Sequence, residues 1–247
     1  MRRQYVITII LLIALWGCAD ADKNISVYMI GDSTMANKKK PDINPEFGWG
    51  QVFHEFFNDQ VTIHNHAVNG RSSKSFIDEG RWDTVLVQLK PGDYVFIQFG
   101  HNDKKEYDPR RYASPVTYRK NLEKFVTETK EKGAYPIILS PIVRRHFNEK
   151  GSLIDTHGLY PLVARAVTKD YDIPFIDLKW ITEKIVVKMG PEYSKSLYLF
   201  VKPGESELYP EGKKDSTHLS YMGALKVAEM VCEELREQVP GLAKNLK

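Results

Sequence analysis

The sequence has few cysteines and no large excess of charge of either sign. Cys18 and Cys232 are the two cysteines among its 247 residues, which is too few for a fold held together by several disulfides. Lysine and arginine number 35 against 32 acidic residues, for a formal net charge of +3. A nucleic-acid-binding protein normally has a much stronger basic excess, so we expect no nucleic-acid partner. The chain also has no internal repeat or low-complexity segment, and its length is typical of one globular domain.

An apolar stretch near the N-terminus is too short to span a bilayer. It covers residues 6–15 and follows Arg2 and Arg3. A basic start followed by a short apolar run is typical of a secretory signal peptide. We therefore expect a signal peptide over residues 1–17 and export of the chain.

The end of this stretch predicts a lipid anchor. Leu15-Trp16-Gly17-Cys18 resembles a bacterial lipobox, which implies lipidation of Cys18 as the first mature residue. The alternative is ordinary signal cleavage nearby, with Cys18 incidental. We expect a polar tether over 18–24 and a catalytic domain over 25–247, held to a membrane only by the lipid, in the periplasm or at the cell surface. Cleavage there leaves Cys232 alone, without an internal disulfide.

Short apolar runs alternate with helical patterns along the rest of the chain. The runs are 27–30, 61–64, 94–99, 136–140 and 174–176. The helical patterns are 49–57, 115–132, 159–171, 178–189 and 220–237. Near-continuous apolar runs of this length suit strands buried on both faces of a parallel sheet. The alternation predicts an α/β fold, a doubly wound, three-layer α/β/α sandwich.

Polar residues are placed where such a sheet carries its ligand, beyond the carboxyl ends of the strands. Ser33 follows the first predicted strand, and Asn102 follows the strand predicted over 94–99. Gly70 lies in the loop after the second strand, and Asp215 and His218 precede the last helix. Acyl transfer needs a nucleophile, a base, an orienter for the base and donors for the oxyanion.

The types of these residues match those roles. Ser33 is the candidate nucleophile, His218 the base and Asp215 its orienter. The N–H of Gly70 and the side-chain amide of Asn102 are the candidate oxyanion donors. No histidine has a spacing that suggests a metal site, so we expect no metal.

The order and spacing of these blocks resemble the SGNH (GDSL-like) hydrolases, named for the Ser, Gly, Asn and His that match Ser33, Gly70, Asn102 and His218. A closer resemblance is to the rhamnogalacturonan acetylesterase branch. The segments that carry it are Tyr28-Met29-Ile30-Gly31-Asp32-Ser33-Thr34-Met35-Ala36, Gly48-Trp49-Gly50, Asn69-Gly70-Arg71-Ser72-Ser73-Lys74-Ser75-Phe76 and Gln98-Phe99-Gly100-His101-Asn102-Asp103.

The resemblance implies a flavodoxin-like SGNH hydrolase fold and hydrolysis of acetyl esters on a pectic polysaccharide through an acetyl-serine intermediate. It also implies an oxyanion hole made by the N–H of Ser33, the N–H of Gly70 and the amide of Asn102, with no metal or other cofactor. One departure is Asn69, where related sequences often carry another glycine.

Residues at the rim of the site are candidates for substrate binding. Arg71 and neighbouring cations would favour an acidic glycan, although most charge clusters are simply solvated surface. His101 is a second candidate, with a structural role in its loop as the alternative. Trp49 is the best of three tryptophans, with Trp82 and Trp180, that could stack on a sugar, although burial in the core is the default for each.

Two other functions stay open from the sequence. One keeps the fold and changes the substrate, to that of a lipase, lysophospholipase, thioesterase or xylan acetylesterase. The other is a non-catalytic, glycan-binding lipoprotein. We expect instead a serine esterase acting on an acetylated, acidic polysaccharide or oligosaccharide.

Overall fold

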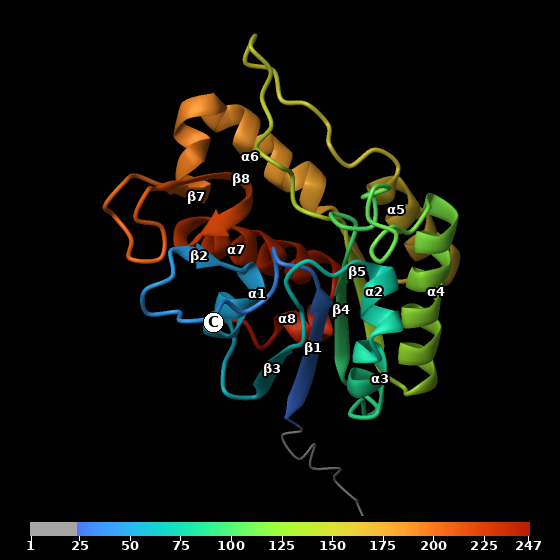
Figure 1. Ribbon diagram of the computed structural model, residues 1–247. Coiled ribbons are helices and arrows are strands. Elements are labelled where there is room, and N and C mark those ends of the chain that lie inside the picture. The colour runs from blue at the N-terminus through green and yellow to red at the C-terminus, as the bar shows by residue number, and fades with distance from the viewer. Residues whose placement is uncertain (1–23) are drawn as a thin grey trace, which may run out of the picture.

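A five-stranded parallel sheet is the middle layer of the computed structural model, which describes residues 24–247 (Figure 1). The predicted signal peptide, Cys18 and all but the last residue of the predicted tether lie outside the described residues. The strands lie in the order β3-β1-β4-β5-β6. Their bounds are Ile25–Gly31 for β1, Val61–Asn65 for β3, Tyr94–Gln98 for β4, Tyr135–Leu139 for β5 and Phe175–Ile176 for β6. Numbered along the chain within this sheet, the order is 2-1-3-4-5, so the predicted flavodoxin-like arrangement is confirmed.

The sheet is buried on both faces because its strands are apolar at successive positions. In β1, Val27 and Met29 enter one hydrophobic core, whereas Tyr28 and Ile30 enter the other. Side chains of a strand alternate between faces, so a continuous apolar run feeds two cores at once.

Helices cover each face of the sheet and complete three layers (Figure 1). One face carries α2 (Ser73–Asp78), α3 (Arg81–Leu86), α4 (Pro115–Glu131) and α5 (Tyr160–Tyr171). The other carries α1 (Trp49–Val52), η1 (Phe53–Phe56), α6 (Leu178–Tyr193), α7 (Tyr221–Gln238) and α8 (Pro240–Ala243). The predicted three-layer sandwich is therefore confirmed.

A second, antiparallel sheet was not predicted. It pairs β8 (Lys213–Ser220) with β2 (Glu46–Phe47) on one side and with β7 (Tyr198–Val201) on the other, and η2 (Ser194–Leu197) precedes β7. Residues 213–218 are polar and show no alternation of apolar side chains. Their extended conformation therefore comes from backbone pairing with the neighbouring strands. Asp215 and His218 consequently lie on a strand and not in a free loop.

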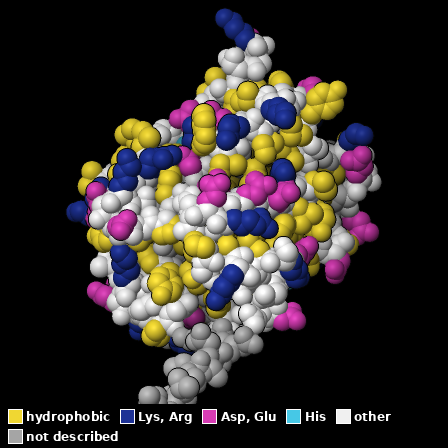
Figure 2. Space-filling model, turned by 180° about the vertical axis from the view of Figure 1, so that it is seen from behind, with side chains coloured by type: hydrophobic (Ala, Val, Ile, Leu, Met, Phe, Trp, Pro, Cys, Tyr) yellow, Lys and Arg dark blue, Asp and Glu magenta, His cyan; other side chains and the backbone are white. Residues whose placement is uncertain are grey.

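The surface opposite to the view of Figure 1 carries charges of both signs. In Figure 2, Lys and Arg side chains are interspersed with Asp and Glu, and neither sign forms a continuous field on this face. Within residues 24–247, no helix is both long and apolar enough to cross a membrane.

Candidate active site

The turn after β1 and strand β8 bring a serine, a histidine and an aspartate into one hydrogen-bonded chain. Ser33 Oγ lies 2.9 Å from Nε2 of His218, and Nδ1 of His218 lies 2.8 Å from Oδ2 of Asp215. Since an ionised carboxylate can only accept, Nδ1 carries a hydrogen and donates to Asp215. Nε2 of a neutral imidazole is then free to accept the proton of the Ser33 hydroxyl.

The backbone beside His218 fixes the carboxylate that orients the ring. Oδ1 of Asp215 accepts hydrogen bonds from the N–H groups of Thr217, at 2.8 Å, and of His218, at 3.0 Å. Burial alone would raise the pKa of Asp215, but these bonds and the bond from the His218 ring hold it well below its usual range. Asp215 therefore stays ionised wherever His218 acts as a base.

Hydrogen bonds of buried polar groups hold the turn that carries Ser33. The N–H groups of Met35 and Ala36 both donate to the carbonyl of Asp32, and the Asp32 carboxylate accepts from the N–H and hydroxyl of Thr34. The side chain of Gln98, at the end of β4, donates to the Thr34 hydroxyl over 2.9 Å. The turn is thus fastened to the neighbouring strand.

The predicted sugar-stacking role of Trp49 is wrong. Its side chain has no exposed surface, and its ring N–H donates to Gln98 over 2.6 Å. Trp49 therefore supports the turn through Gln98 from inside the core. Of the other two tryptophans proposed from the sequence, Trp82 is also fully buried, whereas Trp180 is 57% exposed.

The predicted oxyanion donors come from three neighbouring strands. Ser33 follows β1, Asn102 follows β4 and Gly70 follows β3, and β1 lies between the other two. Among the hydrogen bonds of residues 24–247, none uses the N–H of Ser33 or of Gly70. Gly70 has a φ of +76°, a backbone conformation that favours glycine.

The Asn102 amide is held with its NH2 group toward the Gly70 loop. Nδ2 donates to the carbonyl of Arg71 over 2.9 Å, and Oδ1 accepts from Nζ of Lys105 over 2.7 Å. An ammonium can only donate, so the contact with Lys105 identifies the oxygen of the amide. One hydrogen of the NH2 group is used by Arg71, and the second remains for a substrate oxygen.

Asp103 joins the loop that carries Asn102 to the start of α2. Its Oδ1 accepts from the N–H and hydroxyl of Ser73, and its Oδ2 accepts from the N–H of Gly100. Asp103 is completely buried. Its hydrogen bonds set the distance between the loops of Gly70 and Asn102. The number of residues between the two loops in the sequence does not fix that distance.

Lys38 is a residue of the site that the sequence analysis missed. Its side chain is 2% exposed, and its Nζ donates to the carbonyl of Ser33 and, over 3.0 Å, to Oδ1 of Asn69. It also forms an ion pair with Glu46, at 2.7 Å. One buried ammonium thus ties the nucleophile turn to the residue before Gly70. In the sequence it is hidden in the run Lys38-Lys39-Lys40, which is typical of a solvated loop.

Asn69 acquires a role from this contact. The sequence marked it only as a departure from the glycine that related sequences often carry. In the structure its side chain is the acceptor that links Lys38 to the loop that carries Gly70. A glycine at this position would have more conformational freedom but no side chain to accept the hydrogen bond from Lys38.

The predicted contact of His101 with substrate is also wrong. His101 is 2% exposed, and its Nδ1 lies 3.2 Å from Nε2 of His157. Burial, followed by the charge of neighbouring groups, lowers the pKa of His101 well below its usual value. Its carbonyl accepts from Arg144, so His101 supports the loop from inside. Among residues 24–247, no three His, Cys, Asp or Glu side chains are grouped so as to hold a metal ion.

Arg71 lies at the surface beside Gly70. Its guanidinium donates to Glu79 over 3.0 Å and to the carbonyl of Asn69 over 3.0 Å, and it lines a cavity with other charged side chains. Its role in binding substrate stays a prediction.

Comparisons with known proteins agree with this architecture. Residues 29–221 match the GDSL-like Lipase/Acylhydrolase family. Over 215 residues the chain is 40% identical to rhamnogalacturonan acetylesterase RhgT of Bacillus subtilis, covering 87% of this chain and 91% of that protein. It is 41% identical over 224 residues to a rhamnogalacturonan acetylesterase of Emericella nidulans, covering 83% and 82%.

The fold is also similar to a solved structure. Protein YxiM of Bacillus subtilis superposes with a TM-score of 0.75 at 25% sequence identity, over 89% of this chain. The chain spans 58% of that protein's length.

Removing the Lys38 ammonium tests whether it positions the loop that carries Gly70, the predicted oxyanion donor. We expect Lys38→Met to lower kcat about tenfold or more with little change in KM, because the Ser33 turn and the Gly70 loop lose their common donor. Unpairing Glu46 should also lower the free energy of unfolding by about 3 kcal/mol. Steady-state kinetics on a small acetyl ester and denaturant unfolding measure both effects.

Two further variants separate positioning from stability. Lys38→Met combined with Glu46→Gln should recover stability without recovering kcat, since it restores no link between the two loops. Lys39→Met, at the exposed neighbouring lysine, is the matched control and should behave as the wild type. A double variant whose kcat recovers together with its stability would contradict the positioning role.

The low pKa of Asp215 predicts a dependence of stability on pH. Its folded-state pKa lies below the unfolded value of about 3.9, so the ionised carboxylate stabilises the fold at neutral pH. This contribution is lost as the pH falls below about 4. Asp215→Asn should therefore lower the free energy of unfolding at neutral pH, with a difference from wild type that shrinks below about pH 4. Denaturant unfolding across this pH range measures the difference.

The exposed Asp42→Asn is the control. A difference in the free energy of unfolding between Asp215→Asn and wild type that does not change with pH would refute the linkage.

Proposed function

The chain belongs to the GDSL-like lipase/acylhydrolase family, and we propose that it hydrolyses acetyl esters on a pectic polysaccharide of the rhamnogalacturonan type. Its enzyme class, carboxylic ester hydrolase, is that of its named relatives. The observation that carries the proposal is the 2.9 Å contact between Ser33 Oγ and His218 Nε2. The backbone N–H groups of Ser33 and Gly70, which follow neighbouring strands, support it, because no hydrogen bond of residues 24–247 uses them. The choice of rhamnogalacturonan as the substrate in this proposal is supported by the relatives named as rhamnogalacturonan acetylesterases.

In the first half of the reaction, Ser33 Oγ attacks the acetyl carbonyl carbon while Nε2 of His218 accepts its proton. The carbonyl oxygen becomes an oxyanion, for which the N–H groups of Ser33 and Gly70 and the Asn102 amide are the donors. One such donor typically contributes about 2.7–4 kcal/mol to the stability of the transition state.

The second half regenerates the enzyme. The tetrahedral intermediate collapses, the sugar oxygen leaves with the proton from His218, and the acetyl group stays on Ser33. Water then attacks the acetyl-serine, again with His218 as base, and acetate is released. Asp215 keeps the ring oriented and stabilises its charged form throughout.

Alanine at Ser33 tests the nucleophile. Ser33→Ala should reduce acetate release from acetylated rhamnogalacturonan by about 10⁴-fold or more, because no other group can form the acyl intermediate. Enzymatic quantification of acetate measures the rate, with the exposed Ser152→Ala as the control that retains it. Turnover by Ser33→Ala near the wild-type rate would remove Ser33 from the mechanism.

Two comparisons of hydrolysis rates, one between acyl chains and one between glycans, test the substrate. The charged lining of the cavity beside Gly70 favours an acetylated glycan over a long acyl chain. We expect faster hydrolysis of 4-nitrophenyl acetate than of the octanoate, and acetate release from rhamnogalacturonan ahead of acetylated xylan. Preference for octanoate would favour a lipase, and preference for xylan a different glycan. Binding of the glycan without any acetate release would favour a non-catalytic role.

We also infer from Arg2, Arg3 and the lipobox-like sequence ending at Cys18 that the chain is exported and lipidated. Cys18→Ala should lose incorporation of a clickable fatty acid and move the protein from the membrane fraction to the soluble fraction in a bacterial expression host. Cys232→Ala is the matched control, because Cys232 is buried. Equal fatty-acid labelling of wild type and Cys18→Ala would exclude this anchor.

A further inference from the structure

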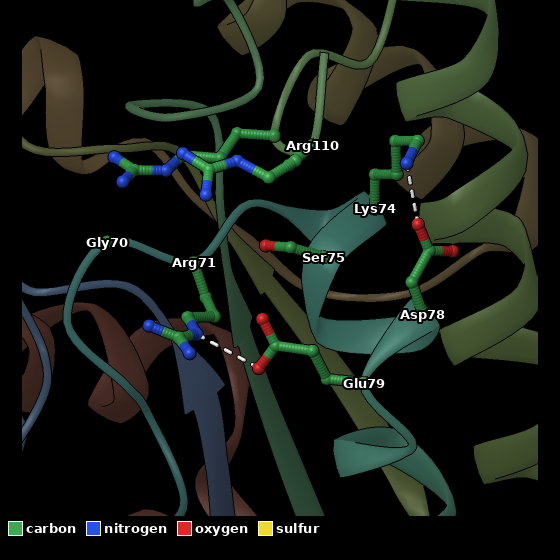
Figure 3. A pocket seen from close by; sticks show the side chains of 8 residues that line it. Gly70, Arg71, Lys74, Ser75, Asp78, Glu79 and Arg110 are labelled. Atoms are coloured by element: carbon green, nitrogen blue, oxygen red, sulfur yellow. Dashed lines mark hydrogen bonds and ion pairs between the residues drawn. The ribbon is translucent and has the colours of Figure 1, made fainter. Parts of the chain in front are cut away.

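A cavity of about 380 Å³ opens directly beside Gly70. Arginine and glutamate side chains surround it, with Arg71 and Glu79 on one side of the opening and Arg110 on the other (Figure 3). Arg111 also lines it, and its guanidinium carbon lies 3.7 Å from the place where a Cβ on Gly70 would be. A cation therefore rests against the predicted oxyanion-hole residue.

The ion pairs of this region leave positive charge in excess. Asp108 is shared by two guanidinium groups, those of Arg110 at 3.2 Å and Arg111 at 3.0 Å. Glu79 is likewise shared by Arg71 at 3.0 Å and Arg81 at 2.5 Å. Two arginines against one carboxylate leave a net positive charge in each cluster.

The remaining pair of the cavity is balanced and does not change this sum. Lys74 pairs with Asp78 at 2.6 Å, one cation to one anion. The nearby Lys105 adds to the excess, because its own contact is the neutral amide of Asn102. Burial, and next the charge of Arg111, lower the pKa of Lys105, which agrees with cations crowding this side of the site.

The two exposed clusters differ in how free their donors are. Arg71 already uses its guanidinium on Glu79 and on the carbonyl of Asn69. Arg111 is bound to Asp108 through Nε. Arg110 donates to the same carboxylate through Nε at 3.2 Å and Nη2 at 3.5 Å, and its side chain is 83% exposed. Arg111 therefore offers its terminal N–H groups beside Gly70, where Nη1 and Nη2 lie 3.7 and 3.9 Å from the place of a Gly70 Cβ. Arg110 adds the N–H groups of Nη1. A guanidinium fork matches the two oxygens of a carboxylate.

We propose that this cavity, which opens beside Gly70, is a subsite for the carboxylate of a uronate residue of the substrate, bound by Arg111 with help from Arg110. The proposal rests on the proposed function for the identity of the glycan. A neutral acetylated glycan gains nothing from the excess charge, so this subsite would set the preference for an acidic chain. Arg71 then shapes the cavity and is not its main ligand.

The test is competitive inhibition of a small neutral ester, which does not depend on which polymer the enzyme deacetylates. The probes are trigalacturonate, which carries carboxylates, and neutral xylotriose, with 4-nitrophenyl acetate as the reporter substrate. Each variant is compared with its own uninhibited rate. We expect trigalacturonate to inhibit the wild type more strongly than xylotriose does, with an inhibition that weakens as salt is added.

Charge-removing variants locate the subsite. Arg111→Gln should raise the inhibition constant of trigalacturonate about tenfold, the effect of losing one charge-assisted contact. Arg110→Gln, at an exposed side chain whose loss leaves the fold intact, should raise it by a smaller factor. Arg119→Gln on α4, which carries the same charge change outside the cavity, should leave both the basal rate and the inhibition constant unchanged.

The outcomes are distinct from those that test the proposed function. Absence of inhibition by trigalacturonate, equal inhibition by xylotriose, or an inhibition constant that neither Arg111→Gln nor Arg110→Gln changes would each overturn the subsite. Failure of the wild type to release acetate from rhamnogalacturonan would overturn the proposed substrate alone. The inhibition by trigalacturonate would still decide whether a uronate binds beside Gly70.

Discussion

The hydrogen bond between Ser33 and His218 is the constraint on which the rest of the structure depends. A serine hydroxyl is a weak nucleophile until a base lies within hydrogen-bond distance, and here the base comes from the far end of the sequence. The base is held on β8, which pairs with β2 and β7, and not on the sheet that carries Ser33. The small antiparallel sheet therefore sets the position of His218 against the end of β1, which is the contact that the proposed mechanism uses.

The order of the parallel strands explains why the other donors meet at the same place. β1 lies between β3 and β4, so the loops that follow these three strands emerge side by side at one edge. The strands bring these loops close together, and contacts between the loops then fix their relative positions. Lys38 links the Ser33 turn to Asn69, and Asp103 links the Asn102 loop to Ser73. The hydrogen bond from Lys38 to Ser33 and the link from Ser73 to Asp103 are buried, and the bond from Lys38 to Asn69 is partly buried. The loss of a buried hydrogen bond is costly.

Much of this arrangement could be predicted from the sequence, because 27–30 and 94–99 are near-continuous apolar runs of a length that suits strands buried on both faces of a sheet. The combination of residue types at Ser33, Asn102 and His218 likewise indicates a site for acyl transfer. The remainder depends on partners far away in the sequence. Nothing in residues 213–218 predicts a strand, since its stability comes from β7 and β2. Similarly, Trp49 looks the same in sequence whether its ring stacks on a sugar or donates to Gln98.

The charges of the site fall into two groups with different effects. Close to the turn of Ser33, the buried ammonium of Lys38 is paired with the carboxylate of Glu46. Toward the cavity the matching stops, because Asp108 and Glu79 each serve two arginines. An excess charge at the rim changes the attraction for an acidic ligand, whereas the same charge at Ser33 would disturb proton transfer. In the proposed subsite, an excess charge at the rim would select the substrate while leaving the proposed chemistry at Ser33 unchanged.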